Sequence, residues 1–140
     1  MIILMGGIVL SVLLGQGEFK YRVVEDWAKL PDEWSFMDVA GVAVNSKDEV
    51  FVFNRGEHPM IIFDIKGNYL RSWGENLFSR PHGIHIGPDD YIYCTDDGDH
   101  TVKKISPDGK LIFQIGVPGK PSEFMSNLPF HRCTHTALCP

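Results

Sequence analysis

Two residues, Arg55 and His82, have side chains suited to chemistry and differ from the residues that occupy matching positions. The chain repeats itself at an offset of 42 residues, so that Arg55 aligns with Asp97 and His82 with Ala40. Arginine presents a rigid fork of N–H donors that suits a carboxylate. A neutral imidazole on an inner strand suits zinc. Because matching residues build the repeat, the residues that break the match are the better candidates for function.

Structural roles remain open for both positions. Arg55 could form a salt bridge to Glu57 or to a neighbouring repeat, and His82 could be a hydrogen-bonded core histidine. Val42 and Ile84 occupy matching positions in successive repeats. Backbone carbonyls from several repeats could together bind a calcium ion on a common axis. The sequence makes such a calcium site possible without requiring it.

Several other functions are disfavoured by composition and motif. The acidic run at 96–99 lacks the spacing and the terminal glutamate of a helix–loop–helix calcium loop. The three cysteines include no CxxC pair, and neither a Ser-His-Asp order nor a nucleotide-binding glycine loop is present. Thirteen basic against 18 acidic residues give a net charge of −5 without a Lys/Arg run. Nucleic-acid binding through a basic surface is therefore not expected.

The elements that would position these residues are short strands. Apolar residues alternate along the unit at 80–117, and Pro, Asp and Gly mark its turns. Its four expected strands cover residues 82–86, 91–95, 101–105 and 110–115. A further strand is expected at 18–24, and no long helical pattern occurs. The pattern predicts an all-β fold.

The repeat length identifies the architecture. Residues 39–75 and 80–117 each read as a four-stranded blade, and a period near 40 residues is typical of a β-propeller. A third blade is expected to start at 129–140, after ten extra residues in a loop at 117–127. Because a propeller closes with roughly 4–8 blades, the chain is expected to be the N-terminal fragment of a longer protein.

The first 17 residues differ in composition from the propeller segment at 18–140. Residues 2–14 are apolar and uncharged, which is short for a membrane span of about 20 residues. They resemble the core of a signal peptide, but no basic residue precedes them and no A-x-A site follows. A signal, a short anchor, a misassigned start and a buried β segment all remain open. The location is therefore cytoplasmic, or secreted or periplasmic if this segment is a signal.

The repeats resemble NHL repeats, and more closely the peptidyl-α-hydroxyglycine α-amidating lyase family and its bacterial relatives. The resemblance runs from about Phe19 to Pro140. It rests on an RGxH motif beginning at Arg55 and a PHG(I/L) motif that contains His82. The segments Val42-Ala43-Val44, Asp99-His100-Thr101-Val102 and Pro107-Asp108-Gly109-Lys110 extend it.

The resemblance implies a propeller of about six blades with zinc bound by three histidines and a structural calcium nearby. It places the first zinc histidine on His82, the calcium carbonyls on Val42 and Ile84, and the substrate-binding arginine on Arg55. The remaining zinc ligands, a catalytic tyrosine, a second arginine and the last calcium ligand would belong to later blades.

The family reaction splits the C–N bond of a peptidyl-α-hydroxyglycine to give a peptide amide and glyoxylate. The implied substrate is therefore a small peptide that carries a carboxylate. This sequence departs from the family after RGxH, where Pro59-Met60 replaces an aromatic and acidic pair, so the substrate is open. A non-catalytic NHL interaction module and a calcium-dependent lactonase-type propeller are the alternatives. Without its later blades, the chain alone is expected to be inactive.

Overall fold

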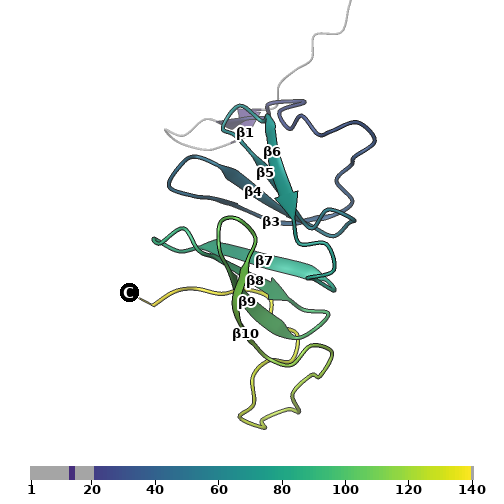
Figure 1. Cartoon of the computed structure of the whole chain (residues 1–140), viewed down its shortest axis with the longest axis vertical. Coiled ribbons are helices and arrows are strands. Elements are labelled where there is room, and N and C mark those ends of the chain that lie inside the picture. Colours follow the sequence, from purple (N-terminus) through teal and green to yellow (C-terminus); the bar gives the residue numbers. More distant parts are fainter. Residues whose placement is uncertain (1–12, 15–20, 140) are drawn as a thin grey trace, which may run out of the picture.

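All regular elements of the protein are β-strands in the computed structural model, which describes residues 13–14 and 21–139 (Figure 1). Eight of the strands form two four-stranded antiparallel sheets, stacked one above the other. In each sheet the strands are neighbours in chain order, as in a propeller blade. The predicted all-β fold with four-stranded blades is thereby confirmed.

The two blades use the same strand order. The first blade consists of β3 (Val39–Val44), β4 (Val50–Asn54), β5 (Met60–Phe63) and β6 (Tyr69–Trp73). The second blade consists of β7 (Pro81–Ile86), β8 (Ile92–Asp96), β9 (Thr101–Ile105) and β10 (Leu111–Ile115).

The blades also match in local detail. A register shift interrupts the first strand pair just before Gly41 in one blade and just before Gly83 in the other. Asp48 and Asp90 occupy the same turn position, and each has a φ of 59°. Aspartate tolerates this left-handed conformation better than most residues. The offset of 42 residues seen in the sequence is therefore also the structural repeat.

The main apolar core lies between the two blades. Strands β3 and β7 lie in contact as the inner strands of adjacent blades. Core residues of the first blade are Phe51, Phe53, Met60, Ile62 and Trp73; those of the second are Ile84, Ile92, Cys94 and Ile105. Burial of a large apolar side chain contributes roughly 1.5–3 kcal/mol, so this shared core fixes the blades against each other.

The opposite face of the first blade is covered by the segment that precedes it. Trp27, Leu30 and Trp34 pack on a second buried cluster that includes Ile61 and Phe63. The Trp27 and Phe63 rings are 5.6 Å apart, and the Trp27 indole N–H donates to the Ile65 carbonyl at 3.2 Å. This segment therefore protects a sheet face that would otherwise be exposed.

The strand expected at 18–24 is shorter than predicted. Within the described residues it is only β2 (Tyr21–Arg22), which pairs with β1 (Leu13–Leu14). Val23 and Val24 are exposed, so no burial supports a longer strand there. The remaining residues of the apolar segment lie outside those described. No helix in the described part of the chain is long and apolar enough to cross a membrane.

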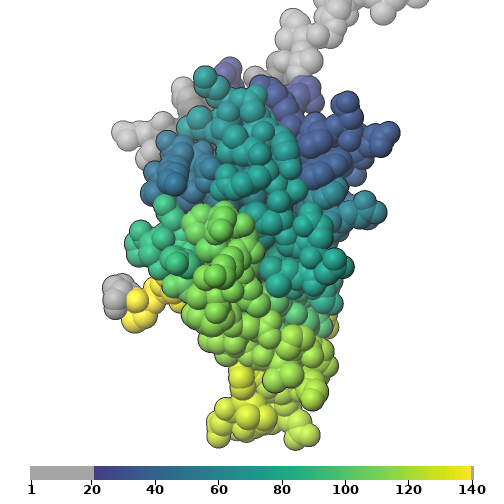
Figure 2. All heavy atoms as spheres, in the orientation of Figure 1, coloured from purple at the N-terminus to yellow at the C-terminus, as the bar shows by residue number. Residues whose placement is uncertain are grey.

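The chain after β10 contains no strand up to residue 139. Residues 117–131 project from the far end of the second blade (Figure 2). The chain then returns to β7, where the Thr134 carbonyl accepts a hydrogen bond from the Thr95 hydroxyl at 3.0 Å. A Cβ on Gly83 would stand 2.4 Å from this carbonyl, which is too close for any side chain. The start of a third blade at 129–140 stays a prediction.

Candidate functional site

Three of the four predicted site residues border one open pocket. His82 and Ile84 lie on β7, and Val42 lies on the adjacent β3. The pocket has a volume of about 360 Å³. The remaining lining residues are Ala40, Gly41, Gly83, Thr134 and His135. Neighbouring inner strands thus bring together the positions that the sequence comparison had isolated.

The His82 ring is oriented by a backbone carbonyl. Its Nδ1 lies 3.0 Å from the Thr134 carbonyl oxygen. Because a carbonyl can only accept, the contact requires a proton on Nδ1, and in the neutral ring the lone pair is then on Nε2. Metal-binding histidines commonly donate their second ring N–H to a carbonyl in this way. The arrangement is therefore suited to a metal at Nε2, although it is also a satisfied hydrogen bond.

A second imidazole, that of His135, borders the same pocket. Sequence comparison missed it, because the residue of the third unit that aligns with His82 is Thr134. The His135 Nδ1 would lie 3.1 Å from a Cβ on Gly83, so the absence of a side chain at Gly83 lets the ring approach β7. The one feature of the sequence that could have pointed to His135 is that it follows Thr134, the residue that aligns with His82.

The residues that border the pocket include donor types that metal ions use. Two imidazoles suit zinc, and the backbone oxygens of Val42 and Ile84 are of the type that calcium prefers. Across residues 13–14 and 21–139, no group of three or more His, Cys, Asp or Glu side chains is placed to bind a metal ion. A complete zinc site would therefore need donors in addition to these two rings.

Two cysteines, Cys133 and Cys94, are protected from ionisation by their surroundings. Burial raises the pKa of the Cys133 thiol, whose Sγ donates to the Thr101 carbonyl at 3.1 Å. Burial also raises the pKa of Cys94 in the core between the blades. Because zinc binds the deprotonated form, these two groups are poor candidates for metal binding.

Arg55, the fourth predicted residue, lies apart from this pocket and has polar partners. Its Nη1 donates to the Asp38 carboxylate at 2.6 Å, and its Nε donates to the Pro81 carbonyl of the next blade at 2.8 Å. Glu57, proposed as an alternative partner, is not the residue it contacts. The Arg55 side chain is 26% exposed and the Asp38 side chain 60%.

The second blade contains the same ion pair with its charges reversed. Arg80 aligns with Asp38, Asp97 aligns with Arg55, and the Arg80 Nη1 donates to the Asp97 carboxylate at 2.7 Å. Arg132, from the segment after the second blade, adds a longer contact of 3.5 Å to the same Asp97 oxygen. The position of Arg55 is therefore an ion-pairing position in both blades.

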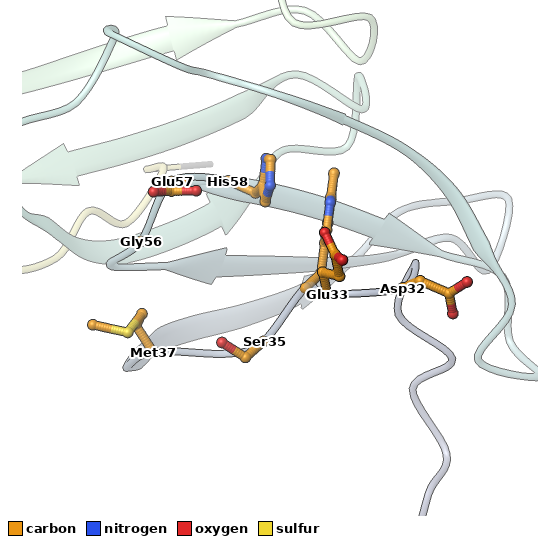
Figure 3. A pocket seen from close by; sticks show the side chains of 8 residues that line it. Asp32, Glu33, Ser35, Met37, Gly56, Glu57 and His58 are labelled. Carbon is orange, nitrogen blue, oxygen red and sulfur yellow. The ribbon is translucent and has the colours of Figure 1, made fainter.

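A pocket beside the RGxH loop has the wrong charge for an anion. It measures about 500 Å³ and is lined by Gly56, Glu57 and His58 together with the preceding segment (Figure 3). That segment contributes Asp32, Glu33, Trp34, Ser35 and Met37. The His58 ring stacks on Trp34 with centroids 3.3 Å apart. Three carboxylates line this pocket and Arg55 does not.

Comparison with known proteins identifies relatives for much of the chain. It is 32% identical over 120 residues to human NHL repeat-containing protein 3, covering 79% of this chain and 34% of the relative. It is 31% identical over 97 residues to mouse peptidyl-glycine alpha-amidating monooxygenase, covering 51% of this chain and 10% of the relative. No family model matches the chain.

A fruit-fly relative, peptidyl-alpha-hydroxyglycine alpha-amidating lyase 1 of Drosophila melanogaster, is 38% identical over 53 residues. That match covers 36% of this chain and 10% of the relative. The chain thus spans from about a tenth to about a third of the length of these relatives. The repeated four-stranded blades and these similarities agree, and the chain belongs to the NHL-repeat β-propeller family, with relatives among the amidating lyases.

Proposed function

We propose that this chain contributes part of the metal-binding centre of a lyase-like propeller. In this proposal His82 binds zinc through Nε2, and the carbonyls of Val42 and Ile84 bind calcium. Arg55 binds the carboxylate of a substrate. The observation that carries the proposal is the contact between the His82 Nδ1 and the Thr134 carbonyl, which leaves Nε2 as the free donor atom.

The proposed reaction is cleavage of a peptidyl-α-hydroxyglycine to a peptide amide and glyoxylate. A bound zinc ion would supply a Lewis acid for the hydroxyl or carbonyl oxygen of the substrate. Arg55 is held by the Pro81 carbonyl, so its guanidinium is pre-oriented at the junction of the blades. Its role would be to bind and orient the substrate carboxylate through charge-assisted hydrogen bonds.

The centre would be incomplete in this chain. Two imidazoles leave zinc short of the three protein ligands that catalytic sites use. A base for the substrate hydroxyl is also needed, and the pocket around His82 offers none besides its two histidines. We therefore expect the 140-residue chain to bind zinc weakly and to give no turnover of a peptidyl-α-hydroxyglycine.

Zinc titration of the purified chain tests the proposal. Calorimetry of the unmodified chain is compared with His82→Ala and His135→Ala, and with Co²⁺ in place of zinc as a spectroscopic probe. We expect His82→Ala to weaken zinc binding by about tenfold or more, the scale seen when metal-site partners are removed. His135→Ala is expected to weaken it less, since that ring is the more exposed.

His85→Ala is the matched control, because His85 lies on β7 but does not border the pocket. A chain whose zinc affinity is unchanged by His82→Ala would refute the metal role of His82. Absence of any zinc binding would favour the alternative of a non-catalytic NHL interaction module. Turnover by the isolated chain would contradict the proposed division of the centre.

A further inference from the structure

The two ion pairs at equivalent positions differ in which partner is fixed. In each pair the residue on the loop after the second strand of the blade is the more buried one. Arg55 is 26% exposed against 60% for Asp38, and Asp97 is 6% exposed against 46% for Arg80. The fixed group is therefore a cation in the first blade and an anion in the second.

Arg55 is anchored independently of the Asp38 carboxylate. Its Nε bond to the Pro81 carbonyl connects it to the next blade, and its backbone N–H donates to the Asp38 carbonyl at 2.9 Å. The Nη2 group makes no hydrogen bond to the described residues. Loss of the Asp38 carboxylate would therefore leave the guanidinium in place with both Nη groups free to donate.

The second blade shows that such a fixed group accepts a further counter-ion. Asp97 receives Arg80 from its own blade and Arg132 from outside it, both on the same carboxylate oxygen. The same arrangement with reversed charges would place two carboxylates on Arg55 in the first blade. One is that of Asp38, and the other would come from outside the blade. No described residue supplies that second carboxylate to Arg55.

We propose that Asp38 is an exchangeable counter-ion of Arg55, and that an incoming carboxylate ligand competes with it for the guanidinium. This inference rests on the proposed role of Arg55 in carboxylate binding. It makes Asp38 a residue that determines affinity: its negative charge repels the ligand and occupies the Nη1 donor that the ligand needs. Removal of that charge should therefore strengthen anion binding.

The test measures binding of N-acetylglycine, a small amide with one carboxylate, to the full chain at pH 7 and low salt. NMR titration gives the dissociation constant, and the spectrum itself reports that each variant is folded. We expect Asp38→Asn to bind about five- to tenfold more tightly than the unmodified chain. Arg55→Gln should abolish binding both alone and in combination with Asp38→Asn.

Asp48→Asn is the matched control, because it makes the same change in net charge at an exposed turn of the same blade. It should leave the affinity within about twofold of the unmodified chain. A second arm raises the salt concentration, which should weaken binding in all variants that retain Arg55. N-acetylalaninamide, which has no carboxylate, should bind to none of them.

The outcomes distinguish the proposed role of Arg55 in carboxylate binding from the proposed role of Asp38 as its exchangeable counter-ion. If binding requires Arg55 but Asp38→Asn binds no more tightly than the unmodified chain, the counter-ion inference is wrong and the role of Arg55 stands. If binding persists in Arg55→Gln, or no variant binds, the carboxylate role of Arg55 fails and takes the inference with it. A gain seen equally in Asp48→Asn would reduce the effect to net charge and overturn the inference.

Discussion

Single polar side chains hold the loop that carries each ion pair. Asp96, fully buried at the end of β8, accepts backbone N–H groups from Ser79, Arg80, Gly98 and Asp99. Asn54, its equivalent in the first blade, accepts those of Met37 and Asp38. An aspartate in one blade and an asparagine in the other thus hold the segment that enters each blade against the end of its second strand.

Replacement of Asp96 by alanine should destabilise the protein substantially. Four backbone donors would lose a charged acceptor, and a lost hydrogen bond to a charged group costs about 1.5–3 kcal/mol, with partial replacement by water reducing the sum. We expect a loss of about 2–4 kcal/mol in the free energy of unfolding, measured by urea denaturation. Asp96→Asn should lose less stability, because Asn54 accepts backbone hydrogen bonds at the equivalent position of the first blade. Equal losses for both variants would contradict this account.

The candidate site was predictable from the sequence only where the repeat marked it. His82 and Arg55 stood out because they differ from the residues at the equivalent positions of the other repeat. Val42 and Ile84 stood out because they occupy equivalent positions in the two repeats. Asp38 gave no such signal, since its pairing with Arg55 depends on how the chain enters β3. His135 was likewise missed, because the register placed Thr134, and not its neighbour, opposite His82. Which side chains pair across a loop depends on the path of the backbone, and comparison of the two repeats does not give that path.

At the scale of elements, strand positions followed from alternation and turn residues. The predicted strand at 101–105 coincides with β9, and the others differ by a residue or two at their ends. Of the predicted strand at 18–24, Tyr21–Arg22 forms β2, the exposed Val23 and Val24 are not in a strand, and residues 18–20 lie outside those described. Residues after 129 align with an inner strand but are not one in the structure. A strand needs a partner for its backbone groups, and none of the described residues provides one there.

The approach of the last segment to β7 requires a glycine. A Cβ on Gly83 would meet the Thr134 carbonyl at 2.4 Å and the Thr95 hydroxyl at 2.7 Å. Gly83→Ala should therefore displace the segment around Thr134 or strain β7, at a cost of about 1–3 kcal/mol. Gly41→Ala, at the equivalent position, would meet the Cγ2 methyl of the buried Ile84 at 2.9 Å but no backbone atom closer than 3.5 Å, and should cost less.

Urea denaturation of both glycine variants measures the difference directly. Amide hydrogen exchange in the Gly83→Ala chain should also show faster exchange at residues 132–135 than in the unmodified chain. Equal stability of the two variants would mean that the last segment does not pack on β7 in solution.

At the scale of the whole molecule, polar contacts at the rim connect the two blades. Glu49 binds Arg71 through two hydrogen bonds of 2.7 and 2.9 Å, and Arg71 also reaches the Pro107 carbonyl of the second blade at 3.3 Å. The Asp90 carboxylate accepts the backbone N–H and the hydroxyl of Ser46 from the first blade. Apolar packing therefore joins the blades inside, whereas at the rim they are joined by the Asp90 carboxylate and by Arg71, which Glu49 orients.

These carboxylates make the coupling of the blades sensitive to acid. The hydrogen bond from Arg71 holds the pKa of Glu49 below its ordinary 4.5, and that from Ser46 holds the pKa of Asp90 below 3.8. Because the folded pKa values are lowered, the stabilisation is complete above the unfolded values and is lost as the pH falls through the folded ones.

The urea midpoint should therefore fall between about pH 5 and pH 2, the range over which lowered carboxyl pKa values act on stability. The combined variant Glu49→Gln and Asp90→Asn should be less stable at pH 7 and should lose less on acidification. An identical pH profile for the variant and the unmodified chain would assign the acid sensitivity to other groups.

The shared register of the two blades has a consequence for the gene as well as for the fold. Any codon in the first repeat has a structural counterpart 42 codons later, so unequal crossing-over between the two would join strands in phase. Removal of residues 45–86, for example, would connect β3 to the turn before β8 with every inward-facing position still facing inward. Loss or gain of a whole blade is thus a single recombination event that preserves the pleat, and blade number can change without passing through a misaligned sheet.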